Sequence, residues 1–543
     1  MKRLSSFGGI MRTSSFRLRC IVIGFVGATA LILYQLCTIM TDHETLQVRQ
    51  QQSSYTLTIP LSTGTIYDHR FERLTNTQKR YYAVVHPTQD AVAAIFTKLC
   101  DREQFYTDLQ RGTPFVCEIT DPEISQDTIW VLQGSDNPTG TRIAQHLIGY
   151  RQNGKGVAGL EAAYADWLSS CDQMAVMHCT VDGVGTMLPG LASSPIHDGS
   201  ENGGIVTTLD RKIQLITEDA LQQAEGTGAA AIVMDVTTGD LRAMASLPVY
   251  DPDHLADYLD DENAPFLNRN LCAYNVGSIF KLVIAATALE QGFTNGYMYD
   301  CSGKIDIYGQ TFRCHKYNGH SLLDLQSALM VSCNPYFISI SRLLSTERLH
   351  DMAEAFGFGQ GIFLANGIQS AAGVLQTEEE LHIEAEKANF SFGQGKLLAT
   401  PLQIAAMTVC IANDGVAVTP RLLLGLTEDG KTLMNNTQAN SRRVMLQETA
   451  NTLQCMMTSA LTNAKEANGR PMYTTAGGKT STAQTGQYDA EGHELCHGWI
   501  TGFFPADTPR YAVTVFVENG GYGNESAAPI FRTIIDQMTI NGY

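Results

Sequence analysis

Apolar and polar positions along the second half of the chain predict strands at its two ends and helices between them. Residues 229–235 form an apolar run typical of a buried strand, and Thr238-Gly239 supplies a turn to a returning strand over 241–246. Helical periodicity and later strand patterns follow, with helices expected over 280–291, 323–343, 400–413 and 529–538 and strands over 499–504 and 511–518. Strands at both ends of a helical middle predict one sheet closed by distant segments, in an α/β (α+β layered) domain.

One apolar stretch near the start of the chain is long enough to cross a membrane. Residues 20–40 contain no charged side chain, and a helix of that length spans the ~30 Å hydrocarbon core of a bilayer. Five basic residues and no acidic residue precede it, namely Lys2, Arg3, Arg12, Arg17 and Arg19, whereas Asp42 and Glu44 follow it. The positive-inside rule therefore predicts a cytoplasmic N-terminus and an extracytoplasmic body.

A cleaved signal peptide is the competing interpretation of this stretch. Its apolar region is normally shorter, about 7–15 residues, and ends at a small-x-small cleavage site. No such site follows Met40. We therefore expect an uncleaved single-pass anchor over 20–40, with a short stub at 1–19, a mixed strand and helix region over 41–204, and a more regular domain over 205–543.

Composition and charge exclude several classes of protein. The chain has 543 residues, of which 44% are hydrophobic and 17% charged, as in ordinary globular proteins and unlike disordered or collagen-like chains. The net charge of −18, with 32 basic against 55 acidic residues after residue 19, argues against nucleic acid as the main partner. The 13 cysteines include no C-x-x-C pair, which disfavours zinc ribbons and thioredoxin-like sites. Cys171/Cys179 and Cys301/Cys314 are possible disulfides, and reduced thiols are an equally good account.

The first candidate for catalysis is Ser278 with Lys281, at the start of an apolar helix. Residues at i and i+3 share a helix face, so the amine can reach the hydroxyl. Backbone N–H groups at the helix start favour developing negative charge, and a lysine desolvated in a cleft can become a general base. The S-x-x-K pattern by itself is common, and a capping serine beside a solvated lysine is the simpler interpretation.

Two further motifs change that balance. Ser332-Cys333-Asn334 precedes Pro335 and is expected between helices, where a hydroxyl and an amide can relay a proton and bind a peptide. Lys479-Thr480-Ser481-Thr482 follows two glycines, and a strand there can present a cation to a carboxylate. The order S-x-x-K, S-x-N, K-T-x is much more specific than any one of its members.

With these motifs the chain resembles the class B penicillin-binding proteins, the monofunctional peptidoglycan D,D-transpeptidases of bacterial cell-wall synthesis. The resemblance extends over most of residues 55–540, in segments that include GTIYD (64–68), AQHLIGY (144–150), GLEAAY (159–164), SFGQGKLLATPLQIA (391–405) and WITGFFPAD (499–507). It implies a serine-transpeptidase (β-lactamase-like) catalytic domain at 205–543, an N-terminal α+β pedestal or dimerisation-like domain at 41–204, and one transmembrane helix.

The resemblance also implies residue roles. Ser278 would be the acylated nucleophile and Lys281 its base, while Ser332 and Asn334 would move a proton and position the stem peptide. Lys479 and Thr480 would bind the terminal carboxylate, and the N–H groups of Ser278 and Thr482 would form the oxyanion hole. Substrate-binding residues would therefore be Lys479, Thr480, Ser481 and Thr482. β-Lactams would acylate Ser278, no metal or organic cofactor is expected, and a polytopic membrane glycosyltransferase is the expected partner.

The sequence departs from the family pattern at three places. Ser481 stands where the third motif normally has glycine, Val276 where proline is usual before Gly277, and Thr63 where arginine usually precedes Gly64. Ser481 is expected to add a side chain where the substrate backbone approaches. Two alternative functions therefore stay open, a D,D-carboxypeptidase or β-lactamase-like hydrolase and a catalytically weakened scaffold for wall synthesis.

Other candidate sites are weaker. The glycines of 357–361 lack the G-K-[ST] of a phosphate-binding loop and favour a turn. His315 and His320 lie near Cys301 and Cys314, but their spacing fits no zinc pattern, so loop packing is favoured. His497 is expected to be structural.

Overall fold

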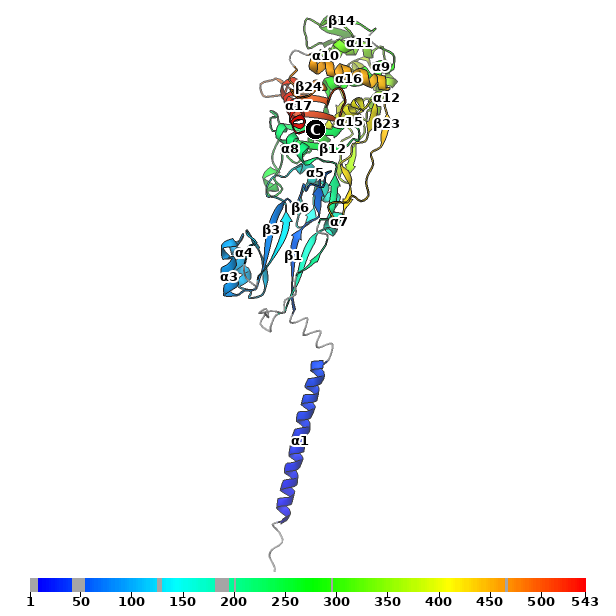
Figure 1. Cartoon of the computed structure of the whole chain (residues 1–543). Helices are drawn as coiled ribbons and strands as arrows, with labels where there is room; N and C mark the ends of the chain where they lie inside the picture. The colour runs from blue at the N-terminus through cyan, green and yellow to red at the C-terminus, as the bar shows by residue number, and fades with distance from the viewer. Residues whose placement is uncertain are drawn as a thin grey trace, which may run out of the picture. The chain divides into compact units, whose positions relative to one another are not determined.

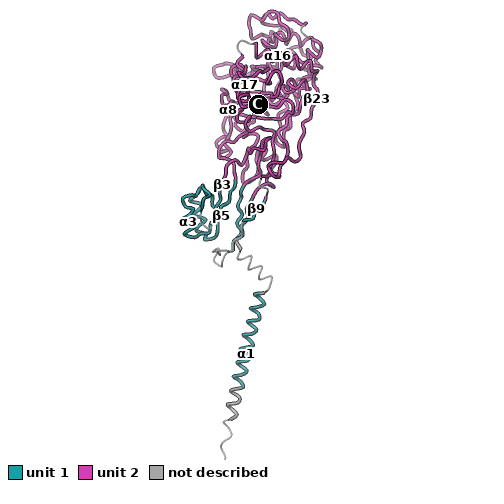
Figure 2. The backbone as a smooth tube through the Cα atoms, in the orientation of Figure 1, with its two compact units in different colours: residues 1–61, 80–134, 174–198 teal, residues 62–79, 135–173, 199–543 magenta. Residues whose placement is uncertain are grey.

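The computed structural model describes residues 8–41, 54–124, 129–180, 195–199, 202–293, 296–463 and 467–543. The chain divides into two compact units, coloured separately in Figure 2. Unit 1 comprises residues 1–61, 80–134 and 174–198, and unit 2 comprises 62–79, 135–173 and 199–543. Residues 62–79 and 135–173, which precede the predicted domain boundary at 204, therefore pack with the unit that contains 205–543.

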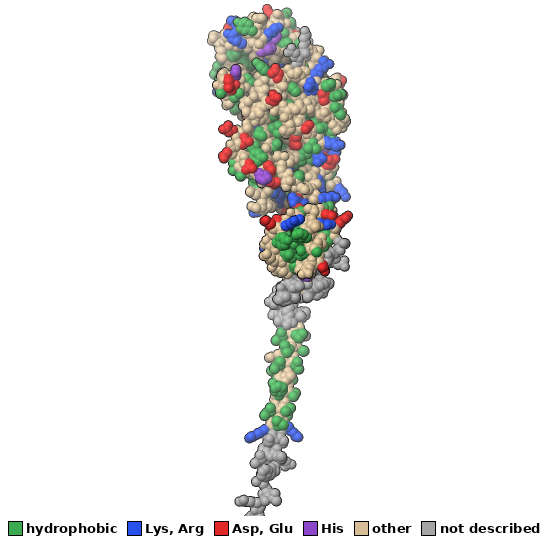
Figure 3. Space-filling model, turned by 90° about the vertical axis from the view of Figure 1, so that its left-hand side faces the viewer, with side chains coloured by type: hydrophobic (Ala, Val, Ile, Leu, Met, Phe, Trp, Pro, Cys, Tyr) green, Lys and Arg blue, Asp and Glu red, His purple; other side chains and the backbone are tan. Residues whose placement is uncertain are grey.

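The N-terminal helix α1 (Gly8–Thr41) contains the predicted apolar stretch. Its segment Phe16–Met40 is long and apolar enough to cross a membrane, and none of it is buried. Figure 3 shows hydrophobic side chains along this helix and basic side chains gathered at one end. The predicted helix over 20–40 is confirmed and fits a single-pass membrane anchor. Lys2 and Arg3 lie outside the described residues.

Apart from α1, the described residues of unit 1 form two small three-stranded sheets and two short α-helices. Its strands are β1 (Ser54–Ser62), β8 (Gln173–Thr180) and β9 (Ile196–Asp198) in one sheet, and β4 (Phe115–Ile119), β3 (Gln78–Val85) and β5 (Ile129–Asp136) in the other. Helices α3 (Gln89–Ile95) and α4 (Arg102–Leu109) pack on β3 and β4 through Ala91, Ile95 and Phe105.

The GTIYD segment begins unit 2. Strand β2 (Thr65–Tyr67) lies parallel to β10 (Gly204–Thr207), which pairs antiparallel with β22 (Leu423–Thr427). Buried Asp68 accepts hydrogen bonds from three backbone N–H groups, those of Arg70, Glu72 and Arg211. Gly64 leaves no room for a side chain, because a Cβ there would lie 2.4 Å from the Leu168 carbonyl oxygen. These contacts explain why the segment needs its glycine and its aspartate.

The central sheet of unit 2 has five antiparallel strands in the order β12-β11-β26-β25-β24. Their bounds are β11 (Gly228–Asp235), β12 (Leu241–Leu247), β24 (Gly477–Tyr488), β25 (Glu494–Phe504) and β26 (Tyr511–Glu518). Alternate residues of β11 enter different hydrophobic clusters, with Ala231 and Val233 in one and Ile232 and Met234 in the other. The sheet therefore separates two cores, which is the layered arrangement predicted from the sequence.

Helices cover both faces of this sheet (Figure 1). One core contains residues of α8 (Arg211–Leu221) and α17 (Gly523–Ile540). The other contains residues of α9 (Lys281–Glu290), α15 (Pro401–Ala412) and α16 (Gln447–Thr462). The apolar residues of α9 and α15 face in all directions and are almost all buried, as expected for helices inside a large core.

The predicted helix over 323–343 is wrong as a continuous helix. The structure has α10 (Leu325–Met330) and α11 (Asn334–Ser341), separated at residues 331–333. Pro335 stands in the first turn of α11, where a missing N–H is tolerated, and Ser332 before it has a φ of +53°. The other predicted helices and strands are present within a few residues, except that α17 begins at Gly523 instead of 529 and β25 at Glu494 instead of 499.

Short elements complete unit 2. They are α5 (Gln145–Ile148), β6 (Arg151–Gln152), β7 (Lys155–Gly156), α6 (Gly159–Ala163), α7 (Ala165–Ser170), β13 (Tyr274–Asn275), β14 (Tyr299–Cys301), β15 (Lys304–Ile307), β16 (Gln310–Arg313), β17 (Ser321–Leu323), α12 (Thr346–Ala355), β18 (Phe363–Ala365), β19 (Ile368–Gln369), α13 (Glu378–Leu381), α14 (Glu384–Phe390), β20 (Leu398–Ala399), β21 (Val416–Val418) and β23 (Ser441–Arg443). Strands β14 to β17 form two small hairpin-like pairs beside the S-x-N turn.

Candidate active site

Ser278 lies in a tight turn that joins β13 to α9. Residues Gly277–Phe280 form one 3-10 turn, η4, and the helix continues from Lys281. Gly277 has a φ of +63°, which favours glycine, and its N–H donates a 2.8 Å hydrogen bond to the Gly393 carbonyl oxygen. The Trp499 indole donates to the Asn275 carbonyl at 3.0 Å. Ser278 is thus placed at the start of a buried helix by contacts on both sides of the turn.

The Lys281 amine connects the first two motifs. Its Nζ lies 3.0 Å from Ser278 Oγ, 3.2 Å from Ser332 Oγ and 2.6 Å from Asn334 Oδ1, and it donates to the Ser332 carbonyl at 2.7 Å. An ammonium has only three N–H groups. The contact with Ser278 can therefore reverse in the neutral amine, with the hydroxyl donating to the nitrogen lone pair.

Burial changes the proton affinity of this amine. The Lys281 side chain is fully buried, and loss of hydration together with the nearby charge of Lys479 holds its pKa well below the ordinary lysine value. A lysine with a lowered pKa has more neutral amine at neutral pH, and only the neutral form can accept a proton from Ser278. The arrangement supplies a general base within hydrogen-bond distance of a hydroxyl.

The S-x-N motif forms the turn between α10 and α11. The strained backbone of Ser332 directs both its carbonyl and its hydroxyl to Lys281. Asn334 begins α11, with its amide oxygen on Lys281 and its Nδ2 3.5 Å from the Arg313 carbonyl oxygen. The turn therefore holds two polar side chains against the amine and joins them to strand β16.

The third motif lies on β24, the edge strand of the central sheet. Lys479 Nζ donates to Ser332 Oγ at 3.1 Å and to the Thr480 carbonyl at 2.8 Å. Burial lowers the pKa of Lys479 to about 8, so the side chain is largely protonated at pH 7. Ser332 is the shared neighbour of both lysines, and the three motifs meet at its hydroxyl.

Ser481 does not occupy the position expected from the sequence. Its side chain is only 3% exposed, and its Oγ donates to the Val276 carbonyl at 2.8 Å. The hydroxyl thus binds the backbone of the nucleophile turn instead of extending into the substrate path. Thr482 Oγ1 accepts a hydrogen bond from the Gly523 N–H at 3.1 Å, which ties β24 to the start of α17.

These residues line a cleft of about 1030 Å³. The eight residues proposed from the sequence include seven of its lining residues, namely Ser278, Ser332, Asn334, Lys479, Thr480, Ser481 and Thr482. Lys281 lies beneath them. The remaining lining includes His315, Lys316 and His320 beside β17, and Tyr522, Asn524 and Glu525 at the start of α17. The volume suits an extended peptide with polar groups at several depths.

Two contributors were not found from the sequence. The Gly393 carbonyl holds Gly277, and a Cβ at Gly393 would lie 2.1 Å from the Gly277 carbonyl oxygen. Cys333, inside the S-x-N motif, lies with Cys301, Cys314 and His320 in one cluster of potential metal ligands. The glycine-rich segment around Gly393 was a signal for a close backbone approach, whereas nothing in the spacing of the cysteines indicated their convergence.

The weaker candidates have structural surroundings. Residues 356–360 form a turn and bend, in agreement with the interpretation of 357–361. His497 is buried between the rings of Tyr274 and Phe516 and accepts a hydrogen bond from the Asn519 N–H. Within the described residues there is no disulfide, so neither Cys171/Cys179 nor Cys301/Cys314 is bonded.

Comparison with known proteins places this geometry in a family. Residues 229–536 match the model of the penicillin binding protein transpeptidase domain. The peptidoglycan D,D-transpeptidase PbpA of Mycolicibacterium smegmatis is 30% identical over 361 residues, which is 61% of this chain and 72% of that protein. The chain belongs to the class B penicillin-binding proteins.

Other relatives agree with this assignment. Stage V sporulation protein D of Bacillus subtilis is 31% identical over 72% of this chain, and the match spans only 61% of that longer relative. Among solved structures, a ceftriaxone acyl-enzyme complex of penicillin-binding protein A from M. tuberculosis aligns with a TM-score of 0.64 at 22% identity, covering 90% of this chain and 99% of that one. The likeness to this solved structure shows the penicillin-binding fold.

The structure also shows how this penicillin-binding protein accommodates its departures from the family pattern. Val276 is fully buried before Gly277, and its carbonyl is the acceptor of Ser481. Thr63, in place of the usual arginine, donates a 3.2 Å hydrogen bond to Asn76 Oδ1. The changes at 276 and 481 are therefore partners in one contact beneath the nucleophile.

Proposed function

We propose that this penicillin-binding protein is a membrane-anchored serine D,D-transpeptidase that cross-links peptidoglycan stem peptides and is acylated by β-lactams. The observation that carries the proposal is the position of Lys281 Nζ, within 3.2 Å of Ser278 Oγ, Ser332 Oγ and Asn334 Oδ1. A helix-start serine in contact with a buried amine of lowered pKa is an activated nucleophile.

In the first step Ser278 Oγ attacks the penultimate D-Ala carbonyl carbon of a donor peptide. The neutral Lys281 amine takes the hydroxyl proton as the C–O bond forms, and the N–H groups of Ser278 and Thr482 stabilise the oxyanion. Ser332, in contact with both lysines, relays a proton to the departing nitrogen, so that the peptide bond breaks and terminal D-Ala leaves. The product is an ester on Ser278.

In the second step an amino group of a neighbouring stem peptide attacks this ester. The new amide bond forms as the Ser278–acyl bond breaks, and a proton from the amine returns to Ser278 Oγ through Lys281. Lys479 and Thr480 bind the terminal carboxylate of the donor before the first step, and Asn334 holds its peptide. The chemistry uses only side chains and backbone N–H groups of this chain.

Covalent labelling tests this proposal directly. Membranes that contain the full chain should form a stable adduct with a fluorescent penicillin, and the adduct should map to Ser278 by peptide mass spectrometry. Ser278→Ala should abolish the label, whereas Ser302→Ala, a serine of the same unit outside the cleft lining, should retain it. Absence of label on the native chain, or undiminished label on Ser278→Ala, would contradict the assignment.

The lifetime of the adduct separates a transpeptidase from a hydrolase. A β-lactamase-like enzyme releases opened penicillin with many turnovers per chain, and a D,D-carboxypeptidase releases D-Ala without forming a cross-linked dimer. Purified full-length chain should retain one penicillin and should form cross-linked peptide dimers from donor and acceptor stems. Rapid turnover of either substrate by water would favour the hydrolase.

The scaffold alternative rested on Ser481, and the buried hydrogen bond of that residue to Val276 removes its main motive. A genetic test remains decisive for it. If Ser278→Ala supports growth where deletion of the whole gene does not, the chain acts as a scaffold. If neither supports growth, the acyl-enzyme is required.

We also propose the orientation and organisation of the chain. Five basic residues before residue 20 support a cytoplasmic stub at 1–19 and a membrane helix at 20–40, which are followed in our proposal by an extracytoplasmic pedestal at 41–204 and a transpeptidase domain at 205–543. Protease added to spheroplasts should digest the region after residue 54 while a tag before residue 8 stays protected. The reverse pattern would overturn the orientation.

A polytopic membrane glycosyltransferase is the partner that the family resemblance supports. The transpeptidase acts on strands that another enzyme polymerises, and α1 would lie in the same bilayer as such an enzyme. Exchange of α1 for an unrelated single-pass helix should leave penicillin labelling unchanged but reduce co-purification of a tagged glycosyltransferase. Equal recovery with both helices would exclude α1 as the contact.

A further inference from the structure

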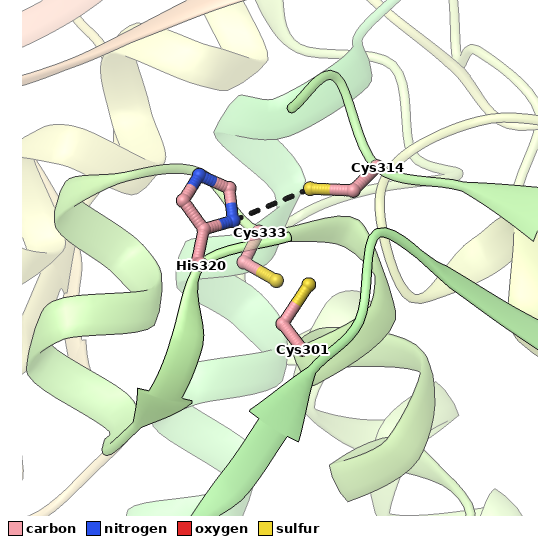
Figure 4. Close-up of side chains that lie close together, drawn as sticks. All are labelled: Cys301, Cys314, His320 and Cys333. Atoms are coloured by element: carbon pink, nitrogen blue, oxygen red, sulfur yellow. Dashed lines mark hydrogen bonds between the residues drawn. The ribbon is translucent and has the colours of Figure 1, made fainter. Parts of the chain in front are cut away.

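Four side chains with metal-binding atoms converge beside the S-x-N turn (Figure 4). The Sγ atoms of Cys301, Cys314 and Cys333 and a ring nitrogen of His320 all lie within 4.8 Å of one another. Cys314 Sγ and His320 Nδ1 lie 3.4 Å apart. The three cysteines are 2%, 7% and 0% exposed, and His320 is partly buried. The three thiols are therefore enclosed, His320 also lines the cleft, and the four donor atoms face a common centre.

Short strands and backbone hydrogen bonds bring these ligands together. Cys301 ends β14, Cys314 follows β16, and His320 precedes β17. The His320 N–H donates to the Cys301 carbonyl at 3.0 Å, and the Cys314 N–H donates to the Gly303 carbonyl at 2.9 Å. Cys333 comes from the turn between α10 and α11. Twelve, five and twelve residues separate consecutive ligands along the chain, so the set contains no C-x-x-C pair and matches no short zinc motif.

The dimensions fit a tetrahedral zinc ion. With Zn–S near 2.3 Å and Zn–N near 2.0–2.1 Å, the edges of a tetrahedral site measure about 3.8 Å between sulfurs and about 3.5 Å between sulfur and nitrogen. The 3.4 Å Cys314–His320 separation already matches the second value. No two donor atoms of the group lie more than 4.8 Å apart, so a sulfur–sulfur distance exceeds the ideal edge by at most about 1 Å, which small rotations of the cysteine side chains can close.

The donor set selects the metal. Thiolates are soft ligands that favour zinc and disfavour calcium and magnesium, which prefer oxygen. Three cysteines and one histidine form a complete Cys₃His set, and no carboxylate belongs to the group. A complete set leaves no open position for water or substrate. The arrangement therefore suits a structural ion and offers no Lewis acid to the reaction.

We propose that Cys301, Cys314, His320 and Cys333 bind a structural zinc ion that joins the S-x-N turn to the wall of the cleft. Binding would convert the thiols to thiolates and release their protons to solvent. The neighbours of Cys333 in sequence, Ser332 and Asn334, both contact Lys281. An ion that fixes Cys333 would fix these two contacts without touching substrate.

The segment that carries the other three ligands has little core of its own. Its buried apolar residues Ile307 and Phe312 form a small cluster with Ile338 and Ala388. Small units of this kind commonly depend on a metal or a disulfide for a defined structure. The same segment places His315 and Lys316 in the cleft lining. Loss of the ion should therefore loosen both the cleft wall and the S-x-N turn.

Metal content tests the proposal without reference to catalysis. The full chain, purified in detergent without chelator, should carry about one zinc per chain by elemental mass spectrometry, as a single four-coordinate site requires. Cys314→Ser and His320→Ala should lose that zinc. His315→Ala and Cys410→Ser should keep it, because His315 adjoins Cys314 without belonging to the group and Cys410 is a buried cysteine of α15.

Three results would overturn the site. Zinc lost from His315→Ala but kept in His320→Ala would show that His315, instead of His320, is the histidine ligand. A native chain without zinc and with all 13 thiols open to alkylation under denaturing, non-reducing conditions would show no metal site. A disulfide between any two of Cys301, Cys314 and Cys333, detected by peptide mapping, would assign the cluster to redox chemistry.

A second measurement uses the unmutated chain and rests on the proposed function. Removal of zinc by a strong chelator should slow penicillin acylation by at least about tenfold, and added Zn²⁺ but not Mg²⁺ should restore it, as for loss of groups that orient a site. Circular dichroism checks that the chelated chain stays folded. Zinc bound at the predicted ligands with an unchanged acylation rate would keep the metal site but remove its coupling to the turn. If neither the zinc-bound nor the chelated chain formed the penicillin adduct, the result would instead contradict the proposed function.

Discussion

The Ser481 hydroxyl donates a 2.8 Å hydrogen bond to the backbone carbonyl of Val276, two residues before the nucleophile. Ser481 stands where the family usually has glycine, and Val276 where the residue before Gly277 is usually proline. The hydroxyl is buried, so the extra side chain supports the nucleophile turn from the edge strand β24. The two departures therefore meet at one hydrogen bond, whose acceptor is a main-chain carbonyl that proline would also supply.

Removing this hydroxyl should weaken the turn. Ser481→Ala leaves the buried Val276 carbonyl without that donor and should lower the free energy of unfolding by about 1 kcal/mol. It should also slow penicillin acylation several-fold, because the backbone before Ser278 is less well held. Denaturant unfolding and stopped-flow labelling measure the two effects.

The matched control for this prediction is Ser246→Ala. Ser246 is a buried serine of β12, at the opposite edge of the sheet, and donates to the Leu267 carbonyl. Its loss should cost similar stability with an unchanged acylation rate. If Ser481→Ala and Ser246→Ala have the same acylation rate, Ser481 has no positioning role.

Gly277 and Ser481 should be energetically coupled. A Cβ at Gly277 would lie 2.5 Å from Ser481 Oγ, and its φ of +63° disfavours any side chain. Gly277→Ala should therefore lower stability by at least about 1–2 kcal/mol from the backbone alone, with a further loss from the clash. In the Ser481→Gly background the clash is gone, so the same substitution should cost less. A double-mutant cycle measures this difference, and additive effects would exclude the clash.

Much of this site could be predicted from short patterns. The ordered motifs located Ser278, Lys281 and Lys479 because each depends on residue types at a fixed local spacing. The apolar run of β11 and the helical periodicity of α9 were equally local, and both elements appear as expected. Local patterns were therefore sufficient for the elements and for most of the cleft.

Contacts between distant segments could not be predicted in this way. The direction of the Ser481 side chain depends on how β24 packs against η4, and the cysteine cluster depends on four segments meeting in space. Apolar periodicity alone continued a helix through residues 331–333, whereas the S-x-N motif before Pro335 was expected between helices, and the structure has the break there. In each case the geometry is decided by tertiary packing and not by the local preference of the sequence.

The pH dependence of acylation should report the Lys281–Lys479 pair. Only neutral Lys281 accepts the Ser278 proton, so the acylation rate should rise with pH through the pKa of Lys281. The charge of Lys479 lowers the pKa of Lys281. Lys479→Gln removes that charge and should move the rising limb to higher pH, in addition to lowering the rate. The profile is measured with a penicillin over a range of pH.

Lys316→Gln provides the control for this shift. Lys316 lines the same cleft, yet it is absent from the groups that perturb Lys281. In Lys316→Gln the rising limb of the pH profile of acylation should stay at the wild-type position. An unmoved limb in Lys479→Gln would show that the two amines do not interact, and Lys281 would then owe its low proton affinity to burial alone.

His497 should make the fold sensitive to acid. Burial lowers its pKa to about 4, and its Nδ1 accepts the Asn519 N–H at 3.2 Å, a bond that the neutral ring alone can make. The unfolded state binds this proton below pH ~6.5 whereas the folded state does so only near pH 4. The free energy of unfolding should therefore fall as pH drops from 6.5 to 4, by up to about 3 kcal/mol from this residue.

Substitution isolates this contribution from that of the carboxyl groups. His497→Asn keeps an acceptor for the Asn519 N–H but cannot gain a proton, so its unfolding free energy should fall less than that of the native chain over the same pH range. His493→Asn changes an exposed histidine near the start of β25 and should reproduce the native slope. Parallel curves for all three chains would mean that His497 is protonated equally in both states. A smaller slope in His497→Asn alone would identify its burial as the cause, because only that substitution removes a proton site that folding shields from water.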